Sequence, residues 1–499
     1  MTEIIHFIPR VALDAHHNMN EFIRVCRDEL TVFGADLDWD ANTWSPPGVS
    51  FGNLDQVTPR LSPFRVMNEH FLDFAKAYFR YQHGHKPTES KVEMRALKCL
   101  ERALDLRGGM ILLNIDASLF DGAAVLAREH YSAAAAYHAG RELERLALFL
   151  SDKRLIASTL DWKSSIARPQ DTVRTGKKAR EERERKLPSD EALEALAEIF
   201  ASNPKAARDV FTTSVAAMLL CAPSRISEIL TLQEDCEVWE TKRNGDRAYG
   251  WRFQPGKGGA PMIKWIPEPM VEVAQIAIQR VRELTAEARR IASWLERHPD
   301  RFYRHSGCPQ VDETQPLSVM EAAAAVGIRW NDENRCRSEL RRLGLSGRRG
   351  GNTLSTVNHW VHSRLPEGFP WFDKKRGVRF SEALFCFQER ALSADITTSR
   401  CVIWRPQTDT FNRDVGPRQP YRGCVLSSVF DRHGYYVDRT KPLKLTSHQF
   451  RHLLDTMAQR GGLSQSEIAR WAGRAPAHAP LRLTLCCPQV KSETCLCFF

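Results

Sequence analysis

Residues 446–462 constrain the fold most, because they predict an amphipathic helix that carries His448 and Arg451 on one face. Ser447 is a suitable N-cap, Gly461-Gly462 ends the run, and apolar residues recur at helical spacing between them (Phe450, Leu453, Leu454 and Met457). Three residues are nearly one helical turn, so the imidazole and the guanidinium point the same way. Such a pair suits a phosphate that gains charge during attack, although in most helices it is surface charge beside a hydrogen-bonded histidine.

A second segment, residues 222–232, follows a run that predicts a strongly apolar helix (Phe211, Val215, Met218 and Leu219). Its sequence, Ala-Pro-Ser-Arg-Ile-Ser-Glu-Ile-Leu-Thr-Leu, places Arg225 at the start of a short helix. A cation there opposes the positive end of the helix dipole, and a bound anion would explain its presence. The alternative is a core helix with an exposed arginine at its N-terminus.

Residues 251–267 predict two strands around a glycine-rich hairpin turn, and Lys257 stands in that turn. Taken alone, Lys257 is a solvated turn lysine.

The segment 222–232, followed well downstream by His-Gln-Phe-Arg-His, resembles the tyrosine recombinases, the phage-type integrase family. The resemblance covers roughly residues 66 to 474. It implies a mainly α fold with a small antiparallel sheet (α+β), in which a helical core-binding domain and a tyrosine-recombinase-type catalytic domain clamp double-stranded DNA. It also implies DNA integration by transesterification without a metal or another cofactor, and self-association on DNA as a tetramer.

The resemblance assigns a role to each of these residues. Arg225 and Arg451 would clamp the non-bridging oxygens of the scissile phosphate, and His448 would donate a hydrogen bond or shuttle a proton. Lys257 matches the hairpin lysine that protonates the leaving 5′-oxygen. Glu228 resembles an acidic residue that holds the first arginine; the alternative is an ordinary exposed helix carboxylate.

The C-terminal part departs from the family pattern. Arg474 stands where a histidine or tryptophan is usual, and a guanidinium can still donate to a phosphate. Leu483 stands where the nucleophilic tyrosine is expected, about nine residues further on, and no tyrosine follows Tyr436. The divergent tail, residues 476–499, holds four of the 13 cysteines (Cys486, Cys487, Cys495 and Cys497) without the spacing of a metal site. Its abrupt change of composition indicates an altered reading frame or a truncated end.

Composition shifts and helical patterns divide the chain into an unassigned region (1–62), a helical domain (63–168), a basic linker (169–188), a larger domain (189–475) and the tail. The resemblance implies that residues 63–168 are the core-binding domain and residues 189–475 the catalytic domain. The basic side chains of the linker are candidate DNA contacts: Arg174, Lys177, Lys178 and Arg180. A charge run is more often a solvated face, and a strand that lies along phosphates is the functional alternative.

The catalytic domain is longer than the family's compact form needs, which predicts an insertion at about residues 285–440. Within it, residues 317–328 have helix–turn–helix character, with Gly327 at the turn and several arginines after it. A basic recognition helix is one interpretation, and a plain helical hairpin with a solvated basic face is favoured.

The composition is that of a globular protein, and its 499 residues predict two to four domains. The net charge of +10 (71 − 61) suits a polyanionic partner. No apolar run predicts a membrane span, no secretory signal is recognised, and the odd, scattered cysteines are typical of reduced thiols. These features predict a cytoplasmic protein, nucleoid-associated when bound to DNA, with neither a membrane nor a metal as partner.

The sequence favours a protein of the recombinase family whose missing tyrosine prevents strand cleavage. A different class, a non-catalytic DNA-binding protein or accessory factor derived from an integrase, stays open. A transcriptional regulator that uses the helix–turn–helix pattern is a third, weaker interpretation.

Overall fold

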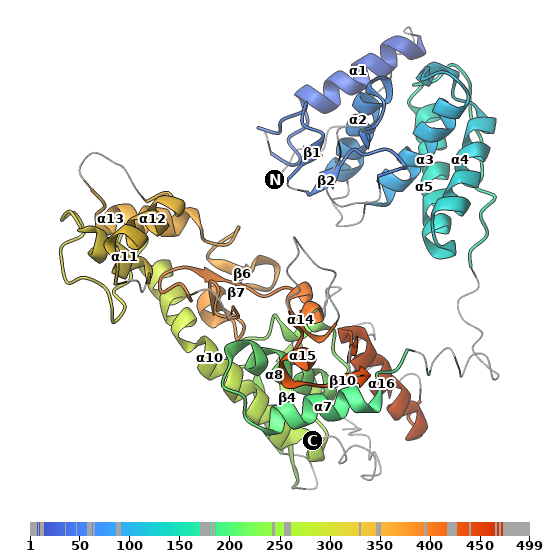
Figure 1. The fold of residues 1–499 in the computed structure, drawn as a ribbon. Helices are drawn as coiled ribbons and strands as arrows, with labels where there is room; N and C mark the ends of the chain where they lie inside the picture. Colours follow the sequence, from blue (N-terminus) through green and yellow to red (C-terminus); the bar gives the residue numbers. More distant parts are fainter. Residues whose placement is uncertain are drawn as a thin grey trace. The chain divides into compact units, whose positions relative to one another are not determined.

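The computed structural model forms two compact units, unit 1 (residues 1–174) and unit 2 (residues 175–499), and each is described by itself (Figure 1). The residues that the structure describes are 7, 9, 14–34, 36–45, 47–56, 62, 65–85, 91–169, 181, 184, 186–241, 245–253, 261–328, 331–345, 351–393, 397–416, 427–438, 441–464, 467–468 and 471–472.

Unit 1 is helical. Its elements are α1 (Ala15–Asp28), β1 (Thr43–Trp44), β2 (Val49–Ser50), α2 (Glu69–His85), α3 (Val92–Leu106), η2 (Leu112–Asn114), α4 (Ala117–His130) and α5 (Ala133–Asp152), and β1 pairs with β2 antiparallel. Phe22 of α1 meets Tyr81 of α2 and Phe149 of α5 edge-on, with ring centroids 5.5 and 5.4 Å apart. The region that the sequence leaves unassigned therefore shares one aromatic core with the helices that follow it.

Glu142 of α5 is buried in this core. Tyr78 donates to its Oε1 at 2.9 Å, and Arg145 pairs with its other oxygen at 2.8 Å. Burial raises the pKa of Glu142 to about 7, and the Arg145 guanidinium and the Tyr78 hydroxyl only partly oppose the rise.

We expect unit 1 to lose stability between pH 4.5 and about 7. A carboxyl whose pKa is higher in the folded than in the unfolded chain stabilises below the unfolded value, and this contribution disappears as the pH rises through the folded value. The shift from 4.5 to about 7 corresponds to roughly 3 kcal/mol at most. Calorimetry of Glu142→Gln should show a flatter pH profile and a unit 1 more stable than wild type at pH 8 by about 1–3 kcal/mol. The exposed Glu129→Gln of α4 is the control, and an unchanged profile for Glu142→Gln would contradict the assignment.

Unit 2 is a helical assembly with short antiparallel sheets. Its helices are α7 (Asp190–Ala201), α8 (Ala207–Cys221), α9 (Ile226–Ile229), α10 (Val271–Arg297), α11 (Val319–Val326), α12 (Glu333–Arg342), α13 (Leu354–Ser363), α14 (Thr408–Val415), α15 (Val429–His433) and α16 (Ser447–Arg460). Three 3-10 turns accompany them: η3 (Glu268–Met270), η4 (Lys374–Arg376) and η5 (Phe380–Glu382). Its strands are β3 (Glu237–Thr241), β4 (Arg247–Phe253), β5 (Met262–Trp265), β6 (Trp371–Asp373), β7 (Val378–Arg379), β8 (Phe387–Gln388), β9 (Ile403–Trp404), β10 (Tyr436–Asp438) and β11 (Lys441–Pro442). They pair as β3-β4-β5, β6-β7, β8-β9 and β10-β11.

The mainly helical content with small antiparallel sheets confirms the coarse part of the predicted fold class, a mainly α protein with antiparallel strands. The helix α8 is apolar nearly all round and is the centre of unit 2, where it packs against α7, α10, α14 and α16. The long α10 leads from this bundle to α11–α13 (Figure 1).

The three-stranded sheet is held close by Gly250 of β4, which pairs with Trp265 of β5. A Cβ on Gly250 would lie 2.7 Å from the carbonyl oxygen of Lys264 and 2.9 Å from the Trp265 ring. Only glycine therefore fits without moving β5, the strand that carries Lys264.

A charged network joins α8, α14 and α15. The buried Asp414 accepts from Thr212 Oγ1 at 2.7 Å and pairs with Arg208 at 2.7 Å and with Arg432 at 2.8 Å. Arg432 also contacts Asp209 of α8. Asp414, 1% exposed, is thus the charged anchor that fixes α14 against the start of α8.

The α11–α12 pair matches the predicted helix–turn–helix pattern, because α11 ends at Gly327 in a left-handed conformation, φ 88°. On α12, Arg337 pairs with Glu333 and Arg342 pairs with Glu339. These ion pairs within one helix favour a plain hairpin with a solvated basic face. In the described part of the chain, no helix combines the length and the apolar character needed to cross a bilayer.

Candidate functional site

Arg225 stands at the turn where α8 gives way to α9. It is the N-cap of α9, with an extended backbone (φ −82°, ψ 147°), and its side chain is 30% exposed. Its amide donates to Glu228 Oε2 at 3.0 Å, and its Nη1 donates to Glu228 Oε1 at 2.8 Å. One carboxylate thus caps the helix and orients the guanidinium. Glu228 is 2% exposed, so it is a buried carboxylate, unlike the solvated side chain of the alternative interpretation.

The residue that sequence reasoning missed is Lys264 of β5, which is 3% exposed. Its Nζ donates to Glu228 Oε2 at 3.0 Å, to Ser224 Oγ at 2.9 Å and to the Pro223 carbonyl at 3.1 Å. The ammonium also lies 4.2 Å from the centre of the Phe253 ring. Lys264 therefore fixes both the loop before Arg225 and the carboxylate that holds Arg225.

Electrostatics tie a second arginine to this group. Burial lowers the pKa of Lys264 to about 8; Glu228 opposes the change, and the positive charges of Arg451 and Arg225 add to it. Burial alone would raise the pKa of Glu228, but Lys264 and then Arg225 outweigh it, so that pKa lies below its usual value. The charges of Arg225 and Arg451 thus both reach the ammonium of Lys264, although the two residues are far apart in sequence.

Arg451 belongs to α16 and is 6% exposed. Its Nη2 donates to the carbonyl of Ala472 at 3.0 Å. The neighbouring Trp471 donates from its indole to the carbonyl of Trp265 at 3.3 Å, which ties the segment after α16 to β5. The Arg451 guanidinium is thus bound to a carbonyl of a segment that is itself hydrogen-bonded to β5.

His448 lies one turn before Arg451 on α16 and is exposed, with its ring 5.6 Å from that of His452. The predicted N-cap of this helix is wrong by one residue. Thr446 is the N-cap, because Gln449 Oε1 accepts from its amide at 2.9 Å, and Ser447 is the first helical residue. The amide of Ser447 instead donates to Asn412 Oδ1 of α14 at 2.9 Å.

Several predicted site residues lie outside the described part of the chain. They are Lys257, Arg474, Leu483 and the four linker residues Arg174, Lys177, Lys178 and Arg180.

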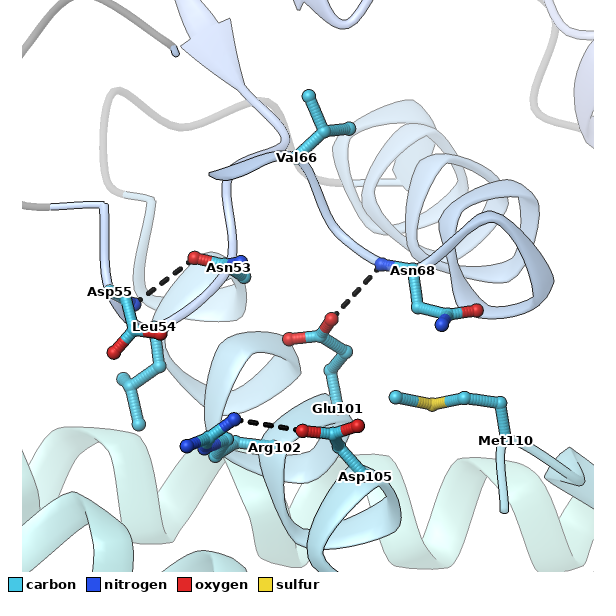
Figure 2. A pocket seen from close by; sticks show the side chains of 9 residues that line it. All are labelled: Asn53, Leu54, Asp55, Val66, Asn68, Glu101, Arg102, Asp105 and Met110. Carbon is cyan, nitrogen blue, oxygen red and sulfur yellow. Dashed lines mark hydrogen bonds and ion pairs between the residues drawn. The ribbon is translucent and has the colours of Figure 1, made fainter. Parts of the chain in front are cut away.

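Two features of unit 1 are unsuited to phosphate. The first is a cavity of about 180 Å³, where Glu101, 5% exposed, accepts from the Asn68 amide at 3.0 Å (Figure 2). Burial raises the pKa of Glu101, and the charges of Asp105 and Asp55 raise it further. Arg102 pairs with Asp105 at 2.8 Å, so the lining is net acidic.

The other feature is an exposed group, Asp14, His16 and His17, in which three potential metal ligands lie close together. Asp14 caps α1 by accepting from the His17 amide at 2.9 Å and contacts the His17 ring at 2.8 Å. Helix capping accounts for this arrangement.

A scan against models of known protein families and a search of curated proteins both gave no match to this sequence.

Proposed function

We propose that this chain binds double-stranded DNA in the manner of a tyrosine recombinase and grips one backbone phosphate between Arg225 and Arg451. The observation that carries the proposal is that both arginines are held next to β5: Arg225 through Glu228 and Lys264, and Arg451 through the carbonyl of Ala472, whose neighbour Trp471 donates to Trp265. Two guanidinium groups that are held in place before binding suit the non-bridging oxygens of a phosphate.

Within this proposal, Lys264 is a positioning residue, because it is buried and contacts Glu228 and the loop at Ser224. Glu228 in turn orients Arg225. His448 is exposed on the helix that carries Arg451, where it could donate to the same phosphate once DNA is bound. We further propose that the chain self-associates on DNA and that the domain of residues 63–168 is the second arm of the clamp.

The missing tyrosine favours a chain that occupies DNA without cleaving it. Its role is then that of an accessory or regulatory DNA-binding factor of integrase descent. The alternative based on α12 as a recognition helix is less favoured, because Arg337 and Arg342 of α12 are paired within their own helix.

We expect duplex DNA affinity to fall steeply with salt, with a log–log slope of roughly −0.9 per phosphate contacted. Arg225→Gln should weaken binding by about tenfold and reduce the slope by about 0.9, because one of the two cations on the phosphate is lost. The matched control is Arg290→Gln, which removes the same charge from an exposed position of α10. Filter binding across a salt series measures both quantities. Absence of affinity for any duplex at low salt, or an equal loss in the control, would contradict the proposal.

We expect no covalent protein–DNA adduct from the purified chain on a nicked suicide substrate that carries a selected binding site. Thr484 and Cys486 stand near the expected tyrosine position, but their oxygen and sulfur lie much closer to the backbone than a tyrosine oxygen. Near-attack geometry tolerates errors of only about 1 Å before the rate falls roughly 10²-fold. Denaturing gels would detect an adduct. One that forms and is then lost on Cys486→Ala or Thr484→Ala would show this expectation to be wrong.

A further inference from the structure

A cavity of about 500 Å³ opens between the start of α8 and two segments of the predicted insertion, residues 390–393 and 404–413. Its charged lining is Arg208, Arg390, Arg405, Arg413 and Asp409. Four cations against one carboxylate give a net charge of +3 (4 − 1). A lining of this sign selects an anion.

Helix geometry adds to this charge. Arg208 belongs to the first turn of α8, and Gln407 is the N-cap of α14. Both helices therefore begin at the cavity, where helix ends carry partial positive charge. Asp414 pairs with Arg208 at 2.7 Å, and Asp409 pairs with Arg413 at 3.1 Å. Among the described residues, Arg390 and Arg405 are then the lining cations without a carboxylate partner, and a bound anion would supply one.

The backbone at Arg390 has a left-handed conformation, φ 67°. Side chains other than glycine rarely adopt it, and such strain is concentrated at functional sites. The amide of Ser393 donates to the Arg390 carbonyl at 2.9 Å, so a tight turn fixes this conformation. The half-buried Arg390 is thereby presented to the cavity.

An aromatic wall accompanies the arginines. Trp404 is half-buried and lines the cavity together with Phe211. Its indole donates to the Gln388 carbonyl at 2.8 Å, so its polar group is satisfied within the protein. The Trp404 ring itself can still stack on a flat aromatic group of a ligand.

We propose that this cavity binds a nucleotide, with its phosphate on the arginines and its base on Trp404. The volume lies within the range of small-molecule sites. Arg208 and Arg225 lie at opposite ends of α8, a helix about 22 Å long, so this site is separate from the candidate phosphate site. The inference does not rest on the proposed function. A free nucleotide and an unpaired nucleotide within a DNA strand offer the same chemistry.

Calorimetric titration of the full chain with deoxyadenosine monophosphate, inorganic phosphate and a short oligothymidylate tests the proposal. Arg390→Gln combined with Arg405→Gln should weaken the monophosphate by tenfold or more, because charge-assisted hydrogen bonds are lost. Trp404→Leu should weaken the monophosphate by about tenfold and leave inorganic phosphate unchanged, because only the base stacks. Arg335→Gln combined with Arg337→Gln on α12 removes the same charge and should have no effect.

Each outcome of these titrations either supports or overturns the nucleotide site. Monophosphate binding that depends on Arg390, Arg405 and Trp404 supports a free nucleotide as ligand. Much tighter binding of the oligonucleotide, with the same dependence, supports an unpaired strand. The proposal is overturned by absence of binding, by equal losses in the α12 control, by binding that ignores Arg390 and Arg405, or by Trp404→Leu weakening inorganic phosphate equally. Circular dichroism checks folding, and Trp404→Met, which keeps a large apolar side chain but no ring, replaces Trp404→Leu if that variant unfolds.

Discussion

Lys264→Met should lower the stability of unit 2 by about 3–5 kcal/mol, the cost of breaking a buried ion pair by removing one partner. The variant leaves Glu228 buried without its ammonium and leaves the Pro223 carbonyl and the Ser224 hydroxyl without their donor. For a unit of this size the melting temperature should fall on the order of 10 °C, which calorimetry would register.

The pH dependence provides a second readout of the same variant. The pKa of Lys264 falls from 10.5 to about 8 on folding because of burial, so the unfolded chain binds more protons between these values. Stability of wild-type unit 2 should therefore rise from pH 8 to 10.5, by up to about 3 kcal/mol, and Lys264→Met should lose this rise.

Two further variants separate pairing from generic damage. Glu228→Gln combined with Lys264→Met should cost clearly less than the sum of the single changes, because each single change leaves an isolated buried charge and the double change leaves none. The exposed Lys205→Met should change stability by less than about 0.5 kcal/mol. Additive single and double variants would refute the coupling.

Asp414→Asn should destabilise unit 2 by a similar amount, about 3–5 kcal/mol. Asp414 receives hydrogen bonds from Thr212, Arg208 and Arg432 while it is 1% exposed. An amide in its place removes the charge that both guanidinium groups share and turns an N–H group toward one of them.

The matched control lies on the same helix. Asp409→Asn makes the same chemical change at a side chain that is 69% exposed and paired with Arg413. Exposed pairs contribute between about 0 and 1 kcal/mol, so chemical denaturation should detect little change. Equal losses for Asp414→Asn and Asp409→Asn would contradict the assignment of Asp414 as a buried anchor.

Local patterns in the sequence were sufficient for the helices near the candidate site. The apolar spacing in residues 211–219 and 450–457 predicts α8 and α16 correctly. The prediction of Ser447 as N-cap is wrong by one residue, an error of the size expected at helix ends. Thr446 and Ser447 both carry hydroxyl groups, and the bond from the Thr446 amide to the Gln449 side chain distinguishes them.

Pairings between distant segments could not be predicted. The burial of Glu228 depends on β5, which starts 34 residues later (262 − 228), and on the register in which Gly250 lets that strand approach. The available signal for Lys264 is a lysine within the apolar run 262–266. The glycine-rich turn instead favours Lys257 as the candidate lysine. The cavity beside Trp404 is lined by segments almost 200 residues apart (404 − 208 = 196). Hydrophobic periodicity within a segment does not predict which distant segments come into contact.

The clamp of Lys264 on Glu228 and of Glu228 on Arg225 has a consequence for recognition. A free arginine side chain loses on the order of 2 kcal/mol of rotamer freedom when it is immobilised. Here the guanidinium is oriented as the sheet folds, so under the proposed function the phosphate would meet a preorganised donor, and most of that entropy loss would fall on folding instead of binding. Under the proposed function, substitutions that weaken the pairing of β5 should therefore weaken anion binding, although they do not contact the anion. The stability of the sheet and the orientation of the Arg225 side chain are then coupled.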